Sequence, residues 1–193
     1  MTDFHEQFQD QLVLAVAALR DGEVIAYPTE AVWGLGCDPW NEQAVLQILH
    51  LKQRPVEKGV ILIAADIEQV EPFIGQLTAE QRQRVIASWS DESAPATTWL
   101  VPLTADIPTW ISGEHSQVAV RVTKHQQTQA LCRAFGKPIV STSANPSGEP
   151  SAIDAAMVRT YFTEQVFVFE GATGGATQPS VIRDVGTGKV LRG

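Results

Sequence analysis

Two short segments carry residue types that bind phosphate, and they stand on either side of one predicted helix. Residues 28–36, PTEAVWGLG, combine a hydroxyl with closely spaced glycines, and residues 51–55, LKQRP, hold two cations. A triphosphate needs several fixed positive charges and backbone N–H groups that it can approach closely, which glycine allows and bulky side chains prevent. No Walker-type loop or dinucleotide fingerprint occurs in the sequence. The two segments therefore predict a phosphate site that is built in a different way.

Lys52, Arg54 and Lys58 form the densest basic cluster of an acidic chain, whose net charge is −8. Nonspecific affinity for nucleic acid comes mainly from Lys and Arg that replace counterions on phosphates, so this net charge disfavours broad binding to nucleic acid. A local basic groove remains open, and so does the simpler interpretation of a solvated loop.

Arg121 is the most informative single residue because it lies inside an apolar run, residues 118–122, VAVRV. An unpaired guanidinium would be costly there, so Arg121 needs an anion. An internal carboxylate, Glu30 or Asp184, is one candidate. A carboxylate or phosphate of a substrate is the other.

A polar loop with the sequence STSANPSG, residues 141–148, follows a predicted buried strand. Its hydroxyls and amide suit the oxygens of a phosphate or an amino acid without adding charge, although serine-rich turns are often purely structural. Open α/β sheets place ligands beyond the ends of strands. We therefore expect this loop to converge with Thr29 and with the basic residues 52–54.

Other catalytic designs fit the sequence poorly. The four histidines are scattered without an HExxH motif or another metal-ligand spacing, and no GxSxG nucleophile elbow occurs. The two cysteines, Cys37 and Cys132, are too few for a disulfide framework and too far apart for a CxxC zinc site. We predict no protein-bound metal and assign no catalytic acid, base or nucleophile.

Apolar periodicity predicts alternating helices and strands. Helices are predicted at residues 4–19, 42–51, 67–74, 79–89, 126–135 and 155–161, and strands at 23–27, 59–64, 99–103, 118–122, 138–141 and 166–170. A hairpin is predicted at 180–184 and 189–192, and residues 171–177, GATGGAT, are expected to be a flexible connection. The alternation indicates an α/β fold.

The length and composition are those of one domain. The chain has 193 residues, of which 44% are hydrophobic, and it contains no internal repeat or linker. Its longest apolar stretches are too short to cross a bilayer, and its N-terminus carries acidic residues where a signal peptide would be basic. We expect a single domain over residues 1–193, located in the cytoplasm and without membrane attachment.

Five segments in this order resemble the YrdC-like family, the single-domain bacterial threonylcarbamoyl-AMP synthases, over nearly the whole chain. They are PTEAVWGLG, LKQRP, VAVRV, STSANPSG and PSVIRD. The resemblance implies a twisted mixed open sheet flanked by helices, with a concave cationic cleft. It also implies condensation of L-threonine, bicarbonate and ATP, accompanied by Mg²⁺, into threonylcarbamoyl-AMP and pyrophosphate. The product would feed the threonylcarbamoyl modification of a tRNA adenosine, which downstream transfer proteins complete.

The resemblance also implies site residues. For ATP they are Lys52 and Arg54 of the KxR motif, Ser143 and Asn145 of the SxN motif, and Arg192, and we add Lys58 from the same basic cluster. For threonine they are Thr29, Arg121 and Ser180, and we add Ser141 from the polar loop 141–148.

The sequence departs from the family pattern at three places. Many relatives have threonine where this chain has Ala31, and a histidine where Ile63 or Ala64 stands. The PGPxT segment of relatives corresponds to residues 93–97, SAPAT. We expect recognition of threonine to differ in detail.

Two other functions compete with the synthase. A noncatalytic RNA-binding or ribosome-maturation factor could use the same cleft for an RNA backbone. The acidic net charge of the chain argues against such a factor. A synthase could itself contact tRNA weakly. A carbamoyl-transfer module of a hydrogenase-maturation protein would bring zinc-finger and acylphosphatase segments, which this sequence lacks.

Overall fold

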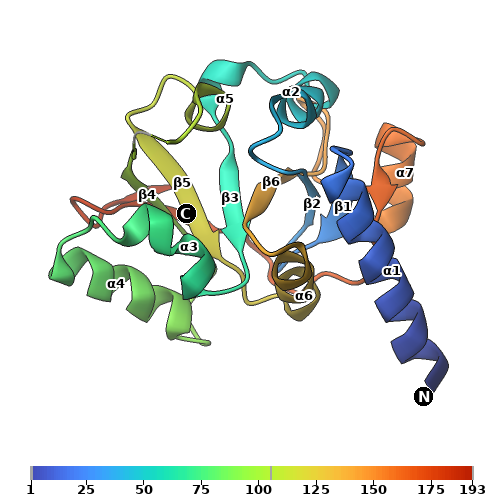
Figure 1. The fold of residues 1–193 in the computed structure, drawn as a ribbon, viewed down its shortest axis with the longest axis horizontal. Coiled ribbons are helices and arrows are strands. Elements are labelled where there is room, and N and C mark those ends of the chain that lie inside the picture. The colour runs from blue at the N-terminus through green and yellow to red at the C-terminus, as the bar shows by residue number, and fades with distance from the viewer. Residues whose placement is uncertain (1, 105, 193) are drawn as a thin grey trace.

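A nine-stranded mixed sheet forms the centre of the computed structural model, which describes residues 2–104 and 106–192. The order across the sheet is β7-β1-β2-β6-β3-β5-β4-β8-β9 (Figure 1). The strands are β1 (Ile25–Pro28), β2 (Trp33–Gly36), β3 (Ile61–Ala64), β4 (Thr97–Pro102), β5 (Gln117–Val122), β6 (Ile139–Ser143), β7 (Phe167–Val168), β8 (Val181–Asp184) and β9 (Val190–Arg192).

Helices flank this sheet. They are α1 (Thr2–Arg20), α2 (Glu42–Leu51), α3 (Ile67–Ile74), α4 (Ala79–Ser90), α5 (Thr109–Ser112), α6 (Gln126–Phe135), α7 (Ala155–Phe162) and a short 3₁₀ helix η1 (Val56–Lys58). In Figure 1, α3 and α4 lie beside the β3–β5–β4 half of the sheet, and α1, α6 and α7 lie beside the β1–β2 half. None of the described helices is both long and apolar enough to cross a bilayer.

Alternate residues of the central strands belong to two separate cores, one on each face of the sheet. In β3, Leu62 and Ala64 pack in the core that includes α2, α3, α4 and α7, whereas Ile63 packs with α1 and α6. The main strand contacts of α1 and α6 are with β1, β3 and β7, so these helices cover only part of their face. The remainder stays open, and Ile61 at the start of β3 lines the resulting cleft. This strand is therefore covered on both faces only beyond Ile61.

Most predicted elements are confirmed, and local capping explains where several helices begin. The side chain of Asn41 accepts a hydrogen bond from the Ala44 N–H, and Thr78 forms a reciprocal capping box with Gln81. The side chains of residues 2–5, Phe4 among them, lie outside the described part of the structure.

Three elements were not predicted, β2, the short 3₁₀ helix η1 and the one-turn helix α5. β2 has the sequence WGLG. Glycine has a low β-propensity, so a segment with two glycines among four residues is not predicted as a strand. Each glycine of β2 nevertheless has a packing reason. A Cβ on Gly36 would lie 2.6 Å from the Val140 carbonyl oxygen and 2.7 Å from the Tyr27 ring. Residues 33–36, whose glycines the sequence assigned to a phosphate site, therefore form a strand that pairs with β1 and β6, and not a glycine turn.

Replacing Gly36 by alanine should destabilise the fold by about 1–3 kcal/mol, because the added methyl group overpacks a site closed by backbone and an aromatic ring. The free energy of unfolding in urea measures this loss. Gly186→Ala is the matched control, since its Cβ would meet only the Asp184 carboxylate, at 3.4 Å. Equal losses in the two variants would contradict the packing explanation.

Candidate functional site

A cleft of about 630 Å³ occupies the open part of the sheet face. The register of the strands shows which residues lie side by side in the floor of this cleft. Ser141, Ile61, Ala119 and Leu100 lie in one row across β6, β3, β5 and β4. Along β5, Arg121 lies two residues to one side of this row. The cleft lining contains the basic side chains Arg54, Lys58, Arg121 and Arg192, and one carboxylate, Glu30.

Arg121 forms a buried ion pair with Glu30, in which Nη1 lies 3.2 Å from Oε2. The other carboxylate oxygen, Oε1, accepts hydrogen bonds from the Thr123 hydroxyl at 2.8 Å and from the Lys124 N–H at 2.9 Å. Burial alone would raise the pKa of Glu30, but the charge of Arg121 and these hydrogen bonds outweigh it and hold the pKa at about 2. Of the two internal partners considered for Arg121, the structure thus selects Glu30 over Asp184.

The ion pair leaves Arg121 able to bind a ligand. Its guanidinium donates no hydrogen bond within the described residues, and the side chain lines the cleft although the residue is 7% exposed. Glu30 Oε2 is fully buried and accepts no hydrogen bond, so the carboxylate holds the guanidinium through charge. The unpaired donors of Arg121 can therefore meet an anion in the cleft.

Lys52 is buried and is not among the residues that line the cleft. Its ammonium donates hydrogen bonds to the carbonyl oxygens of Ser143 and Asn145, at 2.5 and 2.9 Å, and to Asn145 Oδ1 at 3.3 Å. In return, the Ser147 N–H donates to the Lys52 carbonyl oxygen. Burial, with a smaller contribution from the charge of Arg54, lowers the pKa of Lys52 to about 8. In this structure Lys52 fixes the SxN loop from behind.

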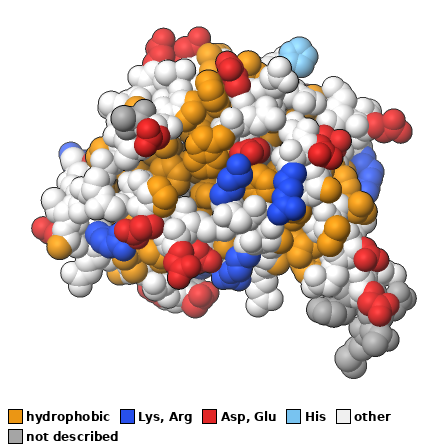
Figure 2. All heavy atoms as spheres, in the orientation of Figure 1, with side chains coloured by type: hydrophobic (Ala, Val, Ile, Leu, Met, Phe, Trp, Pro, Cys, Tyr) orange, Lys and Arg blue, Asp and Glu red, His pale blue; other side chains and the backbone are white. Residues whose placement is uncertain are grey.

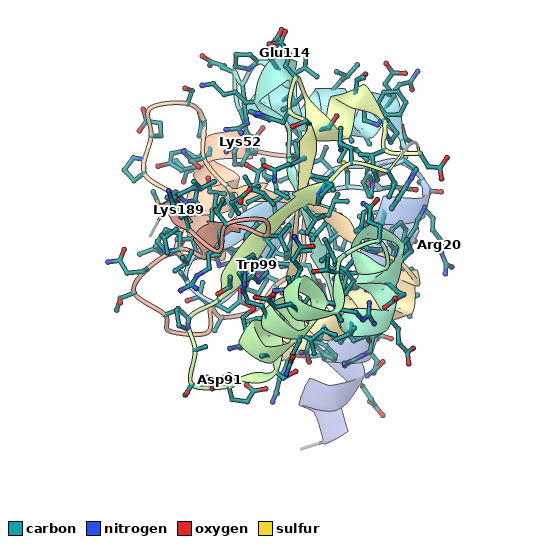
Figure 3. The ribbon with its side chains drawn as sticks, turned by 90° about the vertical axis from the view of Figure 1, so that its left-hand side faces the viewer. Arg20, Lys52, Asp91, Trp99, Glu114 and Lys189 are labelled. Atoms are coloured by element: carbon teal, nitrogen blue, oxygen red, sulfur yellow. The ribbon has the colours of Figure 1, made fainter. Side chains whose placement is uncertain are left out.

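The SxN loop is ordered by its own side chains. Ser143 Oγ donates to Asn145 Oδ1 at 2.6 Å, and Asn145 Nδ2 donates to the carbonyl oxygens of Pro146 and Glu149. Ser141 and Ser143 line the cleft, whereas Asn145 is not part of the lining. Figure 3 shows Lys52 toward the same end of the molecule as Glu114, with Asp91 toward the opposite end.

Arg54 and Arg192 bring two guanidinium groups to the cleft. Arg54 Nη2 donates to the carbonyl oxygens of Lys58 and Gly59, while its buried Nε has no acceptor. Burial and then the charge of Arg192 lower the pKa of Arg54 below its ordinary value, so the two cations repel each other. Arg192 Nη2 donates to the Ser180 carbonyl oxygen at 3.2 Å. An anion with several negative charges would relieve this repulsion.

Thr29 and Ser180 line the cleft with hydroxyls that already have protein partners. Thr29 Oγ1 donates to the Val32 carbonyl oxygen at 2.7 Å and closes the turn before β2. Ser180 Oγ and Thr98 Oγ1 share a hydrogen bond of 2.9 Å. All the sequence-predicted site residues thus line the cleft except Lys52 and Asn145.

The predicted flexible connection at residues 171–177 is instead hydrogen-bonded to the site. The N–H groups of Gly174 and Ala176 donate to the carbonyl oxygens of Thr29 and Glu30, both at 2.9 Å. His125 Nε2 contacts the Ala172 carbonyl oxygen at 2.9 Å. A Cβ on Gly174 would lie 3.2 Å from the Glu30 backbone, so this glycine allows the close approach. A glycine-rich sequence cannot distinguish such an approach from flexibility.

Sequence reasoning missed several residues of the lining. They include His115, Gln117, Leu100, Ile111 and Ile182. The apolar ones look like ordinary core residues in the sequence. Leu100 and Ile182 lie on β4 and β8, in the part of the sheet that α1 and α6 leave uncovered, and Ile111 belongs to α5. Ala31, one of the departures from the family pattern, also lines the cleft.

Comparisons with known proteins agree on one family. The sequence profile of the Sua5/YciO/YrdC family, described as "Telomere recombination", matches residues 17–193. A protein of Cellvibrio japonicus named threonylcarbamoyl-AMP synthase is 54% identical over 179 residues, which are 92% of this chain and 93% of that protein.

Two solved structures are similar in fold. P. abyssi Sua5 in complex with L-threonine has a TM-score of 0.80 and 30% identity over 90% of this chain and 50% of that one. This chain therefore spans about half the length of that Sua5 protein. E. coli YciO has a TM-score of 0.80 and 24% identity over 95% of this chain and 89% of that chain, a likeness of fold.

Acid should remove the stabilisation that Glu30 provides. The folded-state pKa of about 2 lies below the ordinary value of 4.5, so this stabilisation is complete above pH 4.5 and is lost as the pH falls toward 2. Between pH 6 and pH 3 the wild-type chain should lose about 2 kcal/mol more unfolding free energy than Glu30→Gln. Urea denaturation at the two pH values measures the difference.

The matched control is Glu80→Gln, because the Glu80 side chain is 84% exposed in its pair with Arg84. This variant should keep the wild-type dependence on pH. If Glu30→Gln also kept it, the buried pair would not be the source of the acid sensitivity.

Proposed function

The chain belongs to the Sua5/YciO/YrdC family, and on that premise we propose that it is a threonylcarbamoyl-AMP synthase. Such an enzyme condenses L-threonine, bicarbonate and ATP and releases pyrophosphate. Relatives that carry this name match 92% or more of the chain at about half identity. The observation that carries the proposal is the pair of guanidinium groups, Arg54 and Arg192, in a cleft that also holds Arg121.

The triphosphate of ATP would bind beside Arg54 and Arg192. Their mutual repulsion and the unpartnered Nε of Arg54 both favour a polyanion at this place. Lys58 adds a third positive charge at the rim, and the Ser143 side chain lines the cleft nearby as a polar group. Lys52 would contribute by holding the backbone of the SxN loop, and through its charge.

Threonine would bind at the Arg121 end of the cleft. The Arg121 guanidinium would bind the α-carboxylate of threonine. Glu30 would fix the orientation of this guanidinium from the buried side. Thr29, Ser141 and Ser180 line the same cleft and supply polar groups for the rest of the amino acid.

The chemistry would proceed in two steps. The neutral amine of threonine adds to carbon dioxide derived from bicarbonate and loses a proton, which forms a carbamate. A carbamate oxygen then attacks the α-phosphorus of ATP, and the bond to pyrophosphate breaks with its electron pair on the leaving oxygen. Arg54 and Arg192 stabilise the charge that develops on this leaving group.

Mg²⁺ would enter as part of the ATP substrate. Within the described residues, no three or more His, Cys, Asp or Glu side chains gather in a metal-binding group, and the one carboxylate of the cleft lining is engaged by Arg121. These residues do not fit a protein-held magnesium site. No step of the proposed reaction depends on one.

We further propose that the product passes, in the cytoplasm, to proteins that transfer the threonylcarbamoyl group to tRNA. Direct contact with tRNA would be weak. Figure 2 shows acidic and basic side chains interspersed over the pictured face, and the net charge of the chain is −8. Both features disfavour an extended phosphate-binding surface.

Arg54→Ala should lower kcat/KM for threonine-dependent pyrophosphate release by roughly 10²-fold or more, because a preorganised contact to the leaving group is lost. The assay contains ATP, Mg²⁺ and bicarbonate, with threonine, with serine or without an amino acid. Arg82→Ala is the matched control, since Arg82 pairs with Glu71 away from the cleft lining. Its rate should equal that of the wild type.

A wild-type protein without threonine-dependent release, but with salt-sensitive tRNA binding, would favour the RNA-binding factor instead. An unchanged rate in Arg54→Ala would remove Arg54 from the mechanism.

A further inference from the structure

Residues 172–176, with the sequence ATGGA, form a loop whose position depends on hydrogen bonds. Four of these five residues are exposed, and none of the five belongs to either of the two cores. The N–H groups of Gly174 and Ala176 donate to the backbone carbonyl oxygens of residues 29–30, both at 2.9 Å. A segment with so little apolar burial is displaced easily when its hydrogen bonds are lost.

His125 joins this loop to the start of α6. Its Nε2 lies 2.9 Å from the Ala172 carbonyl oxygen. A carbonyl oxygen only accepts hydrogen bonds, so we assign the ring proton to Nε2. The other ring nitrogen, Nδ1, then accepts the Thr128 N–H at 3.4 Å and caps α6. The side chain therefore makes two separate interactions, a loop contact with Ala172 and a cap contact with Thr128.

The start of α6 also holds the chain around Glu30. The His125 N–H donates to Thr123 Oγ1 at 3.1 Å, and the Thr123 hydroxyl donates to Glu30 Oε1 at 2.8 Å. The Thr128 hydroxyl donates to the Pro28 carbonyl oxygen at 2.6 Å. Glu30 and its neighbours are thus bonded to the start of α6 and to the loop, and His125 contacts both of these supports.

The His125 ring and the Glu30 backbone lie against the same residue of the loop. A Cβ on Gly174 would lie 3.5 Å from His125 Cδ2 and 3.2 Å from Glu30 Cα. Glu30 in turn holds the Arg121 guanidinium, with Oε2 at 3.2 Å from Nη1. A displacement of the loop would therefore remove support from the carboxylate that positions Arg121.

The chain that follows the loop is held independently. Ser180 Oγ shares a hydrogen bond of 2.9 Å with Thr98 Oγ1, and the next strand, β8, pairs with β4. Arg192 donates to the Ser180 carbonyl oxygen and keeps this partner when the loop moves. Loss of the loop contact should therefore affect the Arg121 end of the cleft and leave the Arg192 end unchanged.

We propose that His125 is a positioning residue for the amino-acid substrate. Its loop contact keeps residues 172–176 against residues 29–30, and through Glu30 it keeps the Arg121 guanidinium in place. His125 is not part of the cleft lining, so it acts through these residues and does not touch the substrate. The proposal rests on the proposed synthase function, in which Arg121 binds the α-carboxylate of threonine.

Two substitutions separate the two contacts of His125. Asparagine is a favoured N-cap residue, so His125→Asn keeps the cap contact, but its side chain ends near the position of Nδ1 and loses the loop contact. Glutamine can place an amide NH₂ near the position of Nε2 and donate to the Ala172 carbonyl oxygen. Glutamine is not a favoured N-cap, so His125→Gln keeps the loop contact and loses the cap contact.

The first measurement is the kinetics of threonine-dependent pyrophosphate release. His125→Asn should raise the KM for threonine about three- to tenfold, the effect of one net hydrogen bond, while kcat and the KM for ATP stay constant. His125→Gln is the matched control. It should keep the wild-type KM for threonine although its midpoint of urea denaturation falls. A variant that was only less stable would contain fewer active molecules, so its apparent kcat would fall at an unchanged KM.

The second measurement tests the loop contact without the reaction. Hydrogen exchange of the Gly174 and Ala176 N–H groups, followed by NMR, should be faster in His125→Asn than in the wild type. In His125→Gln it should keep the wild-type rate. Unchanged exchange in His125→Asn would show that His125 does not hold the loop, and would overturn the proposal.

The outcomes separate this proposal from the synthase function. If the wild-type chain shows no threonine-dependent release, the synthase function fails, and the role of His125 in threonine binding fails with it. If the wild type is active but His125→Asn keeps the wild-type KM for threonine, only the role of His125 is overturned. An equal rise of this KM in His125→Asn and His125→Gln would also overturn it, because only the first variant loses the loop contact.

Discussion

One buried ion pair, Arg121–Glu30, connects the parts of the chain that form the cleft. An arginine inside an apolar strand requires a partner, because an unpaired buried charge costs several kcal/mol. Glu30 provides the charge and is itself held by the 123–124 turn after β5. The backbone of residues 29–30 also accepts the hydrogen bonds that fix residues 174–176. Three segments distant in sequence are therefore aligned around a single guanidinium.

The basic residues of the site form two groups, which differ in whether protein oxygens neutralise their charge. Lys52 and Arg121 are buried and are held by oxygens of the protein, Lys52 by a loop and Arg121 by Glu30. Arg54 and Arg192 repel each other and have no carboxylate partner within the described residues. Lys52 builds the site, Arg121 both builds it and presents donors to the cleft, and Arg54 and Arg192 add positive charge to the cleft lining. Positive charge in the cleft thus coexists with a net charge of −8 for the chain.

The sequence predicted the features that depend on local or repeated patterns. The capped helices α2 and α4, the alternating α/β order and the family, through five motifs, are confirmed. Features set by distant packing could not be predicted. Either Glu30 or Asp184 could have paired with Arg121, since nothing local gives the strand register. The side-chain directions of Lys52 and Arg54 depend on how α2 ends against the SxN loop, and the side-chain direction of Gln117 depends on Asp184, 67 residues away.

The partial cover of the sheet by α1 and α6 has an energetic consequence. Ile61, Ala119 and Leu100 form a floor that resembles a core from which one helical layer is missing. Their apolar surface is hydrated in the free protein, so its burial is available to whatever fills the cleft. A nucleotide bound there would serve as the third layer of the fold. Its binding would carry a negative heat-capacity change, and the folded state would gain stability in step with ligand concentration.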